Sequence, residues 1–295
     1  MNFVLFVRYN SYSWKGMIGI NRDDDSAHEY DSRKNMSNKK GDSKNSGTVD
    51  QVYCETCSDT SLFKSMFFTT FASMLKYAII VAGGSGTRMG GNLPKQFLLL
   101  RNKPVLYYTI RTFLQAYDDL KIILVLPQEY TDMGQEIVNA WFNKDRIQIT
   151  SGGETRFQSV KNGLQLLEGE SIIFVHDGVR CLLSPALIHA CYEKAMESGT
   201  AIPVVPSKDS VRLITDEGND VVERSKVMLV QTPQTFHSNI LIPAFNIDYN
   251  EKFTDEATVV EAYGQKVSLL RGEETNIKIT TPLDLVIAEN LLSKV

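Results

Sequence analysis

A glycine-rich loop in the first third of the chain is flanked by two basic side chains. The loop runs from Gly83 to Gly90, contains Arg88 and is followed by Lys95. Glycines can adopt positive φ and carry no Cβ, so such a loop can direct several backbone N–H groups at one anion. A guanidinium and an ammonium group are well suited to phosphate oxygens. The spacing therefore predicts that this loop binds a phosphate-bearing ligand.

The glycine spacing differs from that of two better-known phosphate loops. Gly84-x-Gly86-x-x-x-Gly90 places its third glycine one position later than the dinucleotide-binding fingerprint, which disfavours a dehydrogenase. No Gly-Lys-Ser or Gly-Lys-Thr closes the loop, as a Walker motif would require. The remaining alternative is an ordinary strand-to-helix turn beside a basic residue. Two cations in so short a segment favour the phosphate site.

A second group of chemically useful side chains lies in the segment from His176 to Arg180. Asp177 follows an apolar run that predicts a strand, and a carboxylate at a strand end near a phosphate loop is a good ligand for Mg²⁺ or another divalent cation. Arg180 beside it suits a phosphomonoester. For His176 a packed, hydrogen-bonded histidine is favoured over a catalytic one.

Three further segments carry weaker signals. Residues 152–159, Gly-Gly-Glu-Thr-Arg-Phe-Gln-Ser, join a predicted strand to a helix, whose N-terminus favours anions, although ordinary turn chemistry is the alternative. Residues 254–257 combine a helix cap with two acids, and simple capping is a strong alternative. Residues 276–282 place Lys278 at an apparent strand end.

The elements that position these segments alternate along the chain. Their apolar, β-branched runs without alternation indicate strands buried on both faces. This pattern predicts an α/β fold with a doubly wound, mostly parallel, Rossmann-like sheet, which binds ligands at the carboxyl ends of its strands. The predicted strands are residues 77–82, 121–126, 146–150, 171–175, 201–205 and 266–270, and the predicted helices are residues 104–116, 129–142, 155–167, one from Ser184, 255–263 and 281–292.

The alternation of strands and helices breaks at about residues 207–230. Residues 210–214 and 221–224 flank a turn-like segment from Thr215 to Asn219, which predicts a β-hairpin arm. An isolated two-stranded arm is only marginally stable in water. We therefore expect the arm to pack on a second subunit.

Composition excludes several classes of protein. The chain has 295 residues, of which 43% are hydrophobic, so the whole of it is not disordered. Its net charge of −4 disfavours a nucleic-acid binder. No apolar run approaches the roughly 20 residues of a membrane span. Four cysteines form no disulfide framework, which favours a reducing compartment such as the cytoplasm.

Residues 1–75 differ in composition from residues 76–295. Residues 21–50 are polar and charged with almost no large apolar side chain, which predicts disorder, and their acidic residues argue against an organelle transit peptide. Cys54-x-x-Cys57 is half of a zinc site without a second pair, so surface thiols are favoured. Because Met74 directly precedes the first strand, we expect the working protein to begin near it and the leader to be dispensable.

Seven motifs occur in one order along the chain: Ala-Gly-Gly-x-Gly-x-Arg-Met, Pro-Lys-Gln, Gly-Gly-Glu-x-Arg-x-x-Ser, His-Asp-x-x-Arg, Gln-Thr-Pro-Gln, Thr-Asp-Glu-Ala and Asn-Ile-Lys-Ile-Thr. They resemble those of the 2-C-methyl-D-erythritol 4-phosphate cytidylyltransferases, a polyol-phosphate cytidylyltransferase family. The resemblance covers Lys76 to about Leu292 and implies transfer of CMP from CTP to methylerythritol phosphate, with release of pyrophosphate, in non-mevalonate isoprenoid precursor synthesis.

The resemblance also implies a role for each matching residue. CTP would be held by Ala82, Gly83 and Gly84, with Gly153, Glu154 and Ser159 near the cytosine and ribose. Arg88, Lys95 and Lys278 would be catalytic through their charge, and Asp177 would hold Mg²⁺ or another divalent cation. The polyol phosphate would be bound by Arg180, Ser210, Arg224, Thr232, Thr254 and Lys278. In this family the arm crosses to the partner of a homodimer, so Ser210 and Arg224 would serve the neighbour's site.

Two departures from the family pattern and two rival functions stay open. Cys181 stands where the family usually has proline, and Gly178-Val179 stands where many members have two alanines. The closest rival is cytidylyl transfer to ribitol 5-phosphate, which shares three of the motifs; the Gly-Gly-Glu-Thr-Arg segment favours methylerythritol phosphate. The rival of another class is a non-catalytic nucleotide-binding module. The joint presence of Arg88, Lys95, Asp177 and Lys278 argues against that module.

Overall fold

The computed structural model describes residues 3–5, 18–20, 74–83 and 93–293. The chain divides into two compact units, residues 1–64 and 65–295. In the first unit, strands β1 (Phe3–Leu5) and β2 (Ile18–Ile20) pair antiparallel. The predicted disorder of residues 21–50 and the pair Cys54 and Cys57 lie outside the described residues, and the dispensable leader stays a prediction.

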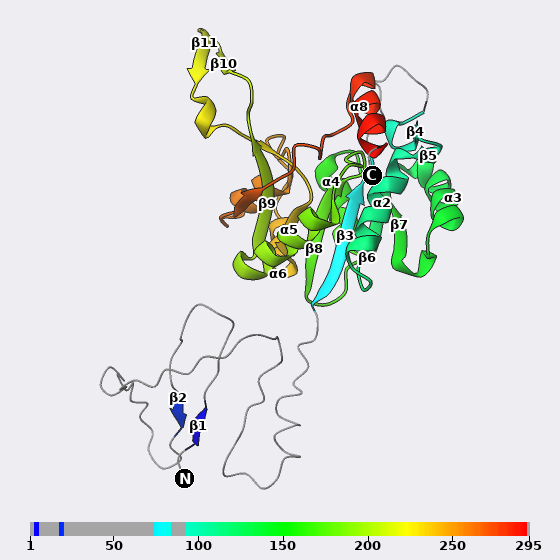
Figure 1. Cartoon of the computed structure of the whole chain (residues 1–295). Coiled ribbons are helices and arrows are strands. Elements are labelled where there is room, and N and C mark those ends of the chain that lie inside the picture. The colour runs from blue at the N-terminus through cyan, green and yellow to red at the C-terminus, as the bar shows by residue number, and fades with distance from the viewer. Residues whose placement is uncertain (1–2, 6–17, 21–73, 84–92, 294–295) are drawn as a thin grey trace, which may run out of the picture. The chain divides into compact units, whose positions relative to one another are not determined.

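The second unit is built on an eight-stranded sheet with four parallel strands at one side (Figure 1). These are β3 (Leu75–Val81), β6 (Lys121–Leu126), β7 (Ile147–Ser151) and β8 (Ser171–Asp177), in the order β8-β3-β6-β7. Strand β3 is central, with Ile79 opposite Ile123 on one side and Val175 on the other. Strands β3, β6 and β8 are almost wholly buried, as their unbroken apolar runs predict.

Helices cover both faces of this sheet, which confirms the doubly wound prediction. Ala78 and Ile80 of β3 pack with helices α2 (Val105–Ala116), α3 (Thr131–Trp141) and α5 (Pro185–Ser198). Tyr77, Ile79 and Val81 point to the opposite face and pack with α4 (Arg156–Leu164), α6 (Ser238–Ala244) and α7 (Glu256–Ala262). The alternation of side chains along a strand thus feeds two cores. Helix α8 (Pro282–Leu292) closes the chain.

The other side of the sheet contains three antiparallel pairings, so the sheet is mostly rather than wholly parallel, as predicted. Strand β13 (Gln234–His237) lies antiparallel between β8 and β9 (Thr200–Pro206), and β12 (Met228–Val230) is antiparallel to β9. Strand β14 (Leu269–Arg271) pairs parallel with β9. Strand β13 was missed because it is short and mostly polar. In the structure, the buried side chain of its first residue, Gln234, forms hydrogen bonds with the start of α7.

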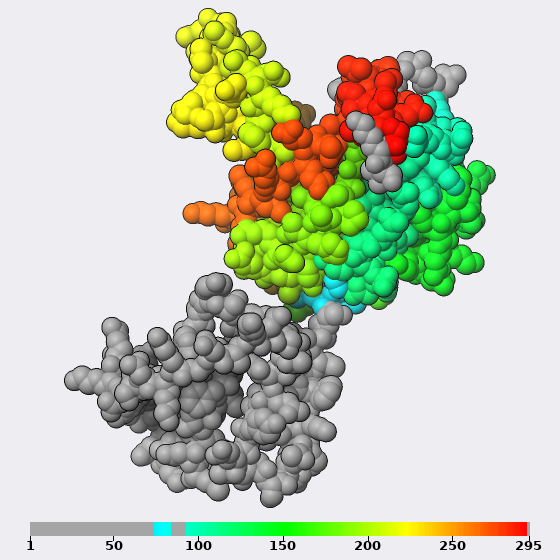
Figure 2. Space-filling model, in the orientation of Figure 1, coloured from blue at the N-terminus to red at the C-terminus, as the bar shows by residue number. Residues whose placement is uncertain are grey.

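The predicted hairpin is confirmed as an arm formed by β10 (Val211–Thr215) and β11 (Gly218–Val222). It stands out from the rest of its unit, in yellow in Figures 1 and 2. Its apolar side chains Leu213, Ile214 and Val221 are exposed. The smaller elements are η2 (Lys95–Phe97), β4 (Leu99–Leu100), β5 (Lys103–Pro104), η3 (Gln128–Tyr130), η4 (Lys144–Arg146) and η5 (Arg224–Lys226). Within the described ranges, every helix is too short or too polar to cross a membrane.

The start of β3 is fixed by contacts within the second unit. Lys76 is buried, and its Nζ lies 2.7 Å from Asp119 Oδ2 and 5.1 and 5.3 Å from the ring centres of Tyr117 and Tyr192. We therefore expect a chain that begins at Met74 to keep the melting temperature and turnover of the full chain. Thermal unfolding and pyrophosphate release test this, and a truncated protein that aggregates or loses activity would contradict it.

Candidate active site

A cavity of about 280 Å³ opens at the carboxyl ends of β3 and β8, beside the start of α4. This edge is where a parallel α/β sheet is expected to bind its ligand. The cavity brings together eight of the predicted residues: Ala82, Gly83, Lys95, Gly153, Glu154, Ser159, Asp177 and Lys278. Gly84 and Arg88 lie outside the described residues. Residues that are far apart in the sequence thus line one cavity, and their roles there stay predictions.

The backbone after β3 is held in place by its neighbours on the sheet and by one buried amide. Ala82 donates its N–H to Val125 O at 2.9 Å. Gln96, which is 1% exposed, donates its Nε2 to Ala82 O at 2.6 Å. The Pro-Lys-Gln motif thus fastens the η2 turn to the end of β3, and this places the adjacent Lys95 at the cavity.

The second glycine segment is shaped by packing within its own chain. Thr155 caps α4 in a reciprocal capping box with Gln158. Gly153 donates its N–H to Ser159 Oγ at 3.2 Å, and that hydroxyl donates to Thr155 O at 2.9 Å. A Cβ on Gly153 would lie 2.4 Å from Gln158 Cβ. Glycine is needed at this position for close approach to the helix, and the Ser159 hydroxyl braces the loop.

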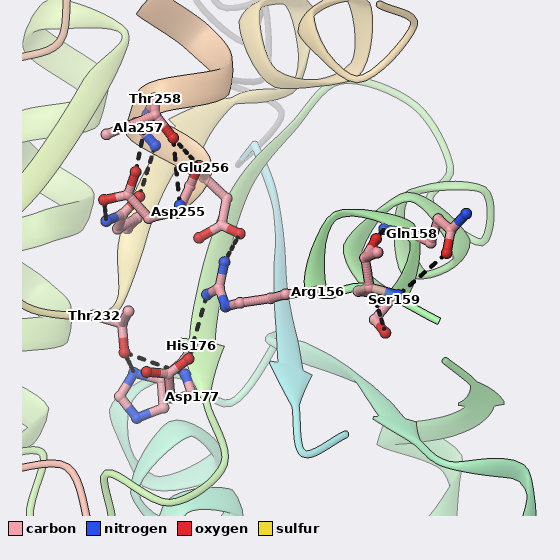
Figure 3. Close-up of polar contacts among 12 residues, drawn as sticks. Arg156, Gln158, Ser159, His176, Asp177, Thr232, Asp255, Glu256, Ala257 and Thr258 are labelled. Carbon is pink, nitrogen blue, oxygen red and sulfur yellow. Dashed lines mark hydrogen bonds and ion pairs between the residues drawn. The ribbon is translucent and has the colours of Figure 1, made fainter. Parts of the chain in front are cut away.

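Asp177, the last residue of β8, lies among three cationic side chains, of which Figure 3 shows Arg156. Its Oδ1 is 3.3 Å from Arg156 Nη2, and its Oδ2 is 3.0 Å from Lys278 Nζ and 3.5 Å from Arg180 Nε. Burial by itself would raise the pKa of Asp177, but Arg156, Lys278 and Arg180 outweigh it and hold that pKa well below its usual range. The carboxylate is therefore ionised at any working pH.

Lys278 and Arg180 reach Asp177 because the segment before α8 is fixed to the end of β8. Ile279 donates its N–H to Val179 O at 3.1 Å. The buried Asn276 donates Nδ2 to Thr232 O at 2.8 Å and accepts from Arg180 Nη1 at 2.9 Å through its carbonyl oxygen. The guanidinium of Arg180 is thus held on two sides.

His176 is a packed, hydrogen-bonded histidine, which confirms the favoured interpretation. It is fully buried; its Nδ1 lies 2.9 Å from Thr232 Oγ1 and its Nε2 3.2 Å from Arg180 O. Thr232 Oγ1 also accepts the N–H of Asp177 at 3.2 Å. A neutral ring that accepts at Nδ1 and donates at Nε2 satisfies all these groups. His176 and Thr232 therefore support the backbone that carries Asp177.

We expect stability to fall as the pH drops from about 6.5 to about 4. Burial is the main cause that lowers the pKa of His176 from 6.5 to about 4, so the unfolded chain binds a proton in this range that the folded chain does not. The free energy of unfolding should fall by about 3 kcal/mol over this range, at about 1.36 kcal/mol per pKa unit. Urea unfolding between pH 4 and 7 measures it. His176→Gln should flatten the curve, and equal slopes in both proteins would contradict the assignment.

The sequence model of the 2-C-methyl-D-erythritol 4-phosphate cytidylyltransferase family matches residues 76–294. The chain belongs to this family. The cytidylyltransferase of Phocaeicola vulgatus is 46% identical over 219 residues, which are 74% of this chain and 100% of that protein. The cytidylyltransferase of Bacteroides fragilis is 45% identical over 219 residues, which again are 74% of this chain and 100% of that protein.

Solved structures of family members agree with this assignment. The 4-diphosphocytidyl-2C-methyl-D-erythritol synthase of Anaerococcus prevotii matches with a TM-score of 0.65 at 28% identity, over 75% of this chain and 99% of that one. The cytidylyltransferase of Thermus thermophilus matches with a TM-score of 0.56 at 30% identity, over 73% of this chain and 98% of that one.

Five residues that the family resemblance assigns to the polyol phosphate lie outside the lining of the cavity: Arg180, Ser210, Arg224, Thr232 and Thr254. Arg180 is largely buried behind Asp177, and Thr232 is bonded to His176. Thr254 is exposed just before α7, whose cap is Asp255. Ser210 and Arg224 are exposed at the base of the arm, and Arg224 donates to Lys208 O at 3.2 Å.

Both departures from the family pattern are accommodated. Cys181 is 3% exposed in a small core with Ile279 and Ala288, and burial raises the pKa of its thiol to about 12, so it is inert at neutral pH. Gly178 fills a tight place, because a Cβ there would lie 2.8 Å from Ala82 Cβ. Neither position alters a charged group of the cavity.

Sequence reasoning missed two charged residues of this candidate site. Arg156 lines the cavity and bridges Asp177 and Glu256, and Glu256 is buried. Both lie in motifs that the sequence analysis singled out, but the two residues are 100 positions apart. An acidic residue in a helix-capping motif is normally expected to be exposed, so the sequence gives no sign that Glu256 is buried. Only the folded chain shows that Arg156 contacts it.

The donor set around Asp177 fits a divalent cation in one arrangement. In the part of the chain that the structure describes, no group of three or more His, Cys, Asp or Glu side chains could hold a metal. Asp177 is a single carboxylate, and Mg²⁺ is commonly held by one or two carboxylates together with substrate phosphates and waters. The site therefore fits Mg²⁺ provided that a bound triphosphate supplies the remaining oxygens.

Proposed function

We propose that the cavity between β3, β8 and α4 is where this chain transfers CMP from CTP to 2-C-methyl-D-erythritol 4-phosphate, in isoprenoid precursor synthesis. Family membership at 46% identity supports the reaction, and the cations around Asp177 support the place. A phosphate oxygen of the polyol attacks the α-phosphorus of CTP in line, and pyrophosphate leaves. The attacking group is already an anion, so the step needs no general base.

In this proposal CTP enters with its triphosphate toward β3. The backbone of Ala82, Gly83 and Gly84 holds the phosphates, while Gly153, Glu154 and Ser159 contact the cytosine and ribose. Because Ser159 braces Gly153, the loop around the base is preformed before CTP binds.

The chemistry rests on positive charge brought to the reacting phosphorus. Arg88, Lys95 and Lys278 stabilise the charge that develops on the α-phosphate and the leaving pyrophosphate. Asp177 holds Mg²⁺ or another divalent cation, which supplies further charge neutralisation to the phosphates when bound. Lys278 is the cation beside Asp177 that is best able to move, because its side chain is 42% exposed.

We propose that the polyol phosphate is bound by Thr254 and Lys278, together with Ser210 and Arg224 from the arm of a partner in a homodimer. The family resemblance also assigns Arg180 and Thr232 to it, and binding there would require them to exchange their present contacts with Asp177, Asn276 and His176. The exposed apolar side chains of the arm support such a partner, since two strands by themselves are only marginally stable.

The free, buried thiols of Cys181 and Cys191 are consistent with our proposal of a cytoplasmic location.

The dimer proposal predicts that charges on the arm dissociate the protein. Ile214 and Val221 are 78% and 74% exposed, and Ile214→Glu with Val221→Lys should weaken the dimer about thirtyfold or more, since buried interface anchors are worth about 2 kcal/mol. Sedimentation measures it. Ile242→Glu, at an exposed apolar position on α6, is the control. An arm variant that stays dimeric at the same concentration would contradict the proposal.

One assay tests the function and its rivals. Pyrophosphate release is measured with each of four nucleoside triphosphates and with methylerythritol phosphate or ribitol 5-phosphate. We expect turnover with CTP and methylerythritol phosphate above all other pairs. Preference for ribitol 5-phosphate would favour the related cytidylyltransferase, and binding of CTP without release of pyrophosphate would favour the non-catalytic nucleotide-binding module.

A further inference from the structure

The guanidinium of Arg156 lies between two carboxylates from different parts of the fold (Figure 3). Arg156 is the first residue of α4, and its Nη2 is 3.3 Å from Asp177 Oδ1 at the end of β8. Its Nη1 donates to Glu256 Oε1 in the first turn of α7. One side chain thus joins the start of two helices to the end of a central strand.

Glu256 is a fixed anchor for this arginine. Its residue is 1% exposed, and the turn that carries it is held by the capping box of Asp255 and Thr258. Gln234 of β13 locks the same turn, because it donates to Asp255 Oδ2 and accepts from Ala257 N, both at 2.8 Å. The carboxylate therefore has little freedom to follow a moving partner.

The three cations at Asp177 differ in how firmly they are held. Lys278 is 42% exposed, whereas the side chains of Arg156 and Arg180 are 28% and 13% exposed. Of these three, Arg156 is the one for which the structure gives a contact with a second carboxylate. Moving Arg156 onto a phosphate would leave a buried carboxylate unpaired, which is strongly unfavourable.

We propose that Arg156 is a positioning residue that orients the Asp177 carboxylate, and that Glu256 keeps Arg156 in place when the phosphates arrive. Because Arg156 keeps its contact with Asp177 Oδ1, the other carboxylate oxygen, Oδ2, is the one that would release Lys278 and bind a metal ion. This inference rests on the proposed role of Asp177 in holding a divalent cation. Groups that orient a metal ligand commonly affect metal affinity or activity by about 10- to 100-fold.

The test compares Arg156→Lys and Glu256→Gln with the unmodified chain. Lysine keeps the charge but cannot bridge two carboxylates with separate nitrogens, and glutamine keeps the size of Glu256 without its charge. We expect each variant to lower kcat about tenfold or more while the KM for CTP changes less than about threefold. Mn²⁺ binding with α,β-methylene CTP, followed by electron paramagnetic resonance without turnover, should weaken about tenfold.

Asp255→Asn is the matched control, because the amide oxygen can still accept from Thr258 N and keep the turn that carries Glu256, while the charge and the acceptor for Gln234 are removed. It should lower the melting temperature but leave kcat and Mn²⁺ binding unchanged. Variants at 156 and 256 that behave like this control would reduce the pair to a structural role and overturn the proposal. A raised KM for CTP at unchanged kcat would also overturn it, because Arg156 would then bind the nucleotide directly.

Two features keep this test independent of other failures. If one of the two variants does not fold, the other still carries the comparison with Asp255→Asn. Turnover of the unmodified chain with CTP and methylerythritol phosphate tests the proposed function separately. An inactive unmodified chain therefore counts against the function, and an active one with unaffected variants counts against the positioning role.

Discussion

Lys95→Ala is expected to lower turnover at least about a hundredfold while the protein stays folded, which is the scale of one lost electrostatic donor in a preorganised site. Lys95 lines the cavity next to Gln96, whose amide fixes the end of β3. The substitution removes the ammonium group and leaves Gln96 and Phe97 in their buried places. The phosphate under attack would then lose a positive charge whose stabilising effect is greatest in the transition state.

Single-turnover release of pyrophosphate with saturating CTP measures the loss at Lys95. Lys103→Ala is the matched control: its ammonium lies 4.5 Å from the ring centre of Trp141, and it is not among the residues that line the cavity. That control should keep normal turnover. Near-normal turnover of a folded Lys95→Ala protein would refute the proposed mechanism.

Asp177→Asn is expected to be the more damaging change, with turnover lowered about a thousandfold and stability reduced by about 3 kcal/mol. Asparagine keeps the size but leaves Arg156, Arg180 and Lys278 facing one another without the anion that separates them. It also removes the carboxylate oxygen that we propose to hold a divalent cation. Both effects follow from one lost charge.

Urea unfolding and pyrophosphate release measure the two effects at Asp177. Glu197→Gln is the control for stability, because its ion pair with Lys194 on α5 is as close, at 2.9 Å, but the side chains of Glu197 and Lys194 are 71% and 33% exposed. Such a pair is worth about 1 kcal/mol or less. An Asp177→Asn protein as stable and as active as this control would show that the cluster is not the centre of the site.

The sequence predicted the elements that are apolar and locally patterned. Strand β6 runs from Lys121 to Leu126 as predicted, because each of its residues after the first is buried against a helix on one face or the other. The hairpin arm was recognised from its turn. In both cases the deciding information lies within about ten consecutive residues.

The elements that were missed depend on partners far away in the chain. Strand β13 reads as polar, and it is a strand only because β8 and β9 flank it and α7 satisfies its glutamine. The pair of Arg156 and Glu256 was missed for the same reason. The family resemblance assigns Gly153 to the nucleotide, and the structure adds a reason for glycine that the sequence does not show, because a Cβ there would lie 2.4 Å from Gln158 Cβ.

The cluster around Asp177 has a consequence for how an anion finds this protein. Three positive and two negative side chains meet there, in a chain whose net charge is −4. A small, highly charged solute can be drawn by the local field into a basic recess, while a long polyanion meets a surface that repels it. We therefore expect selectivity for free nucleotides over nucleic acids to begin during diffusion, before any group of the base is recognised.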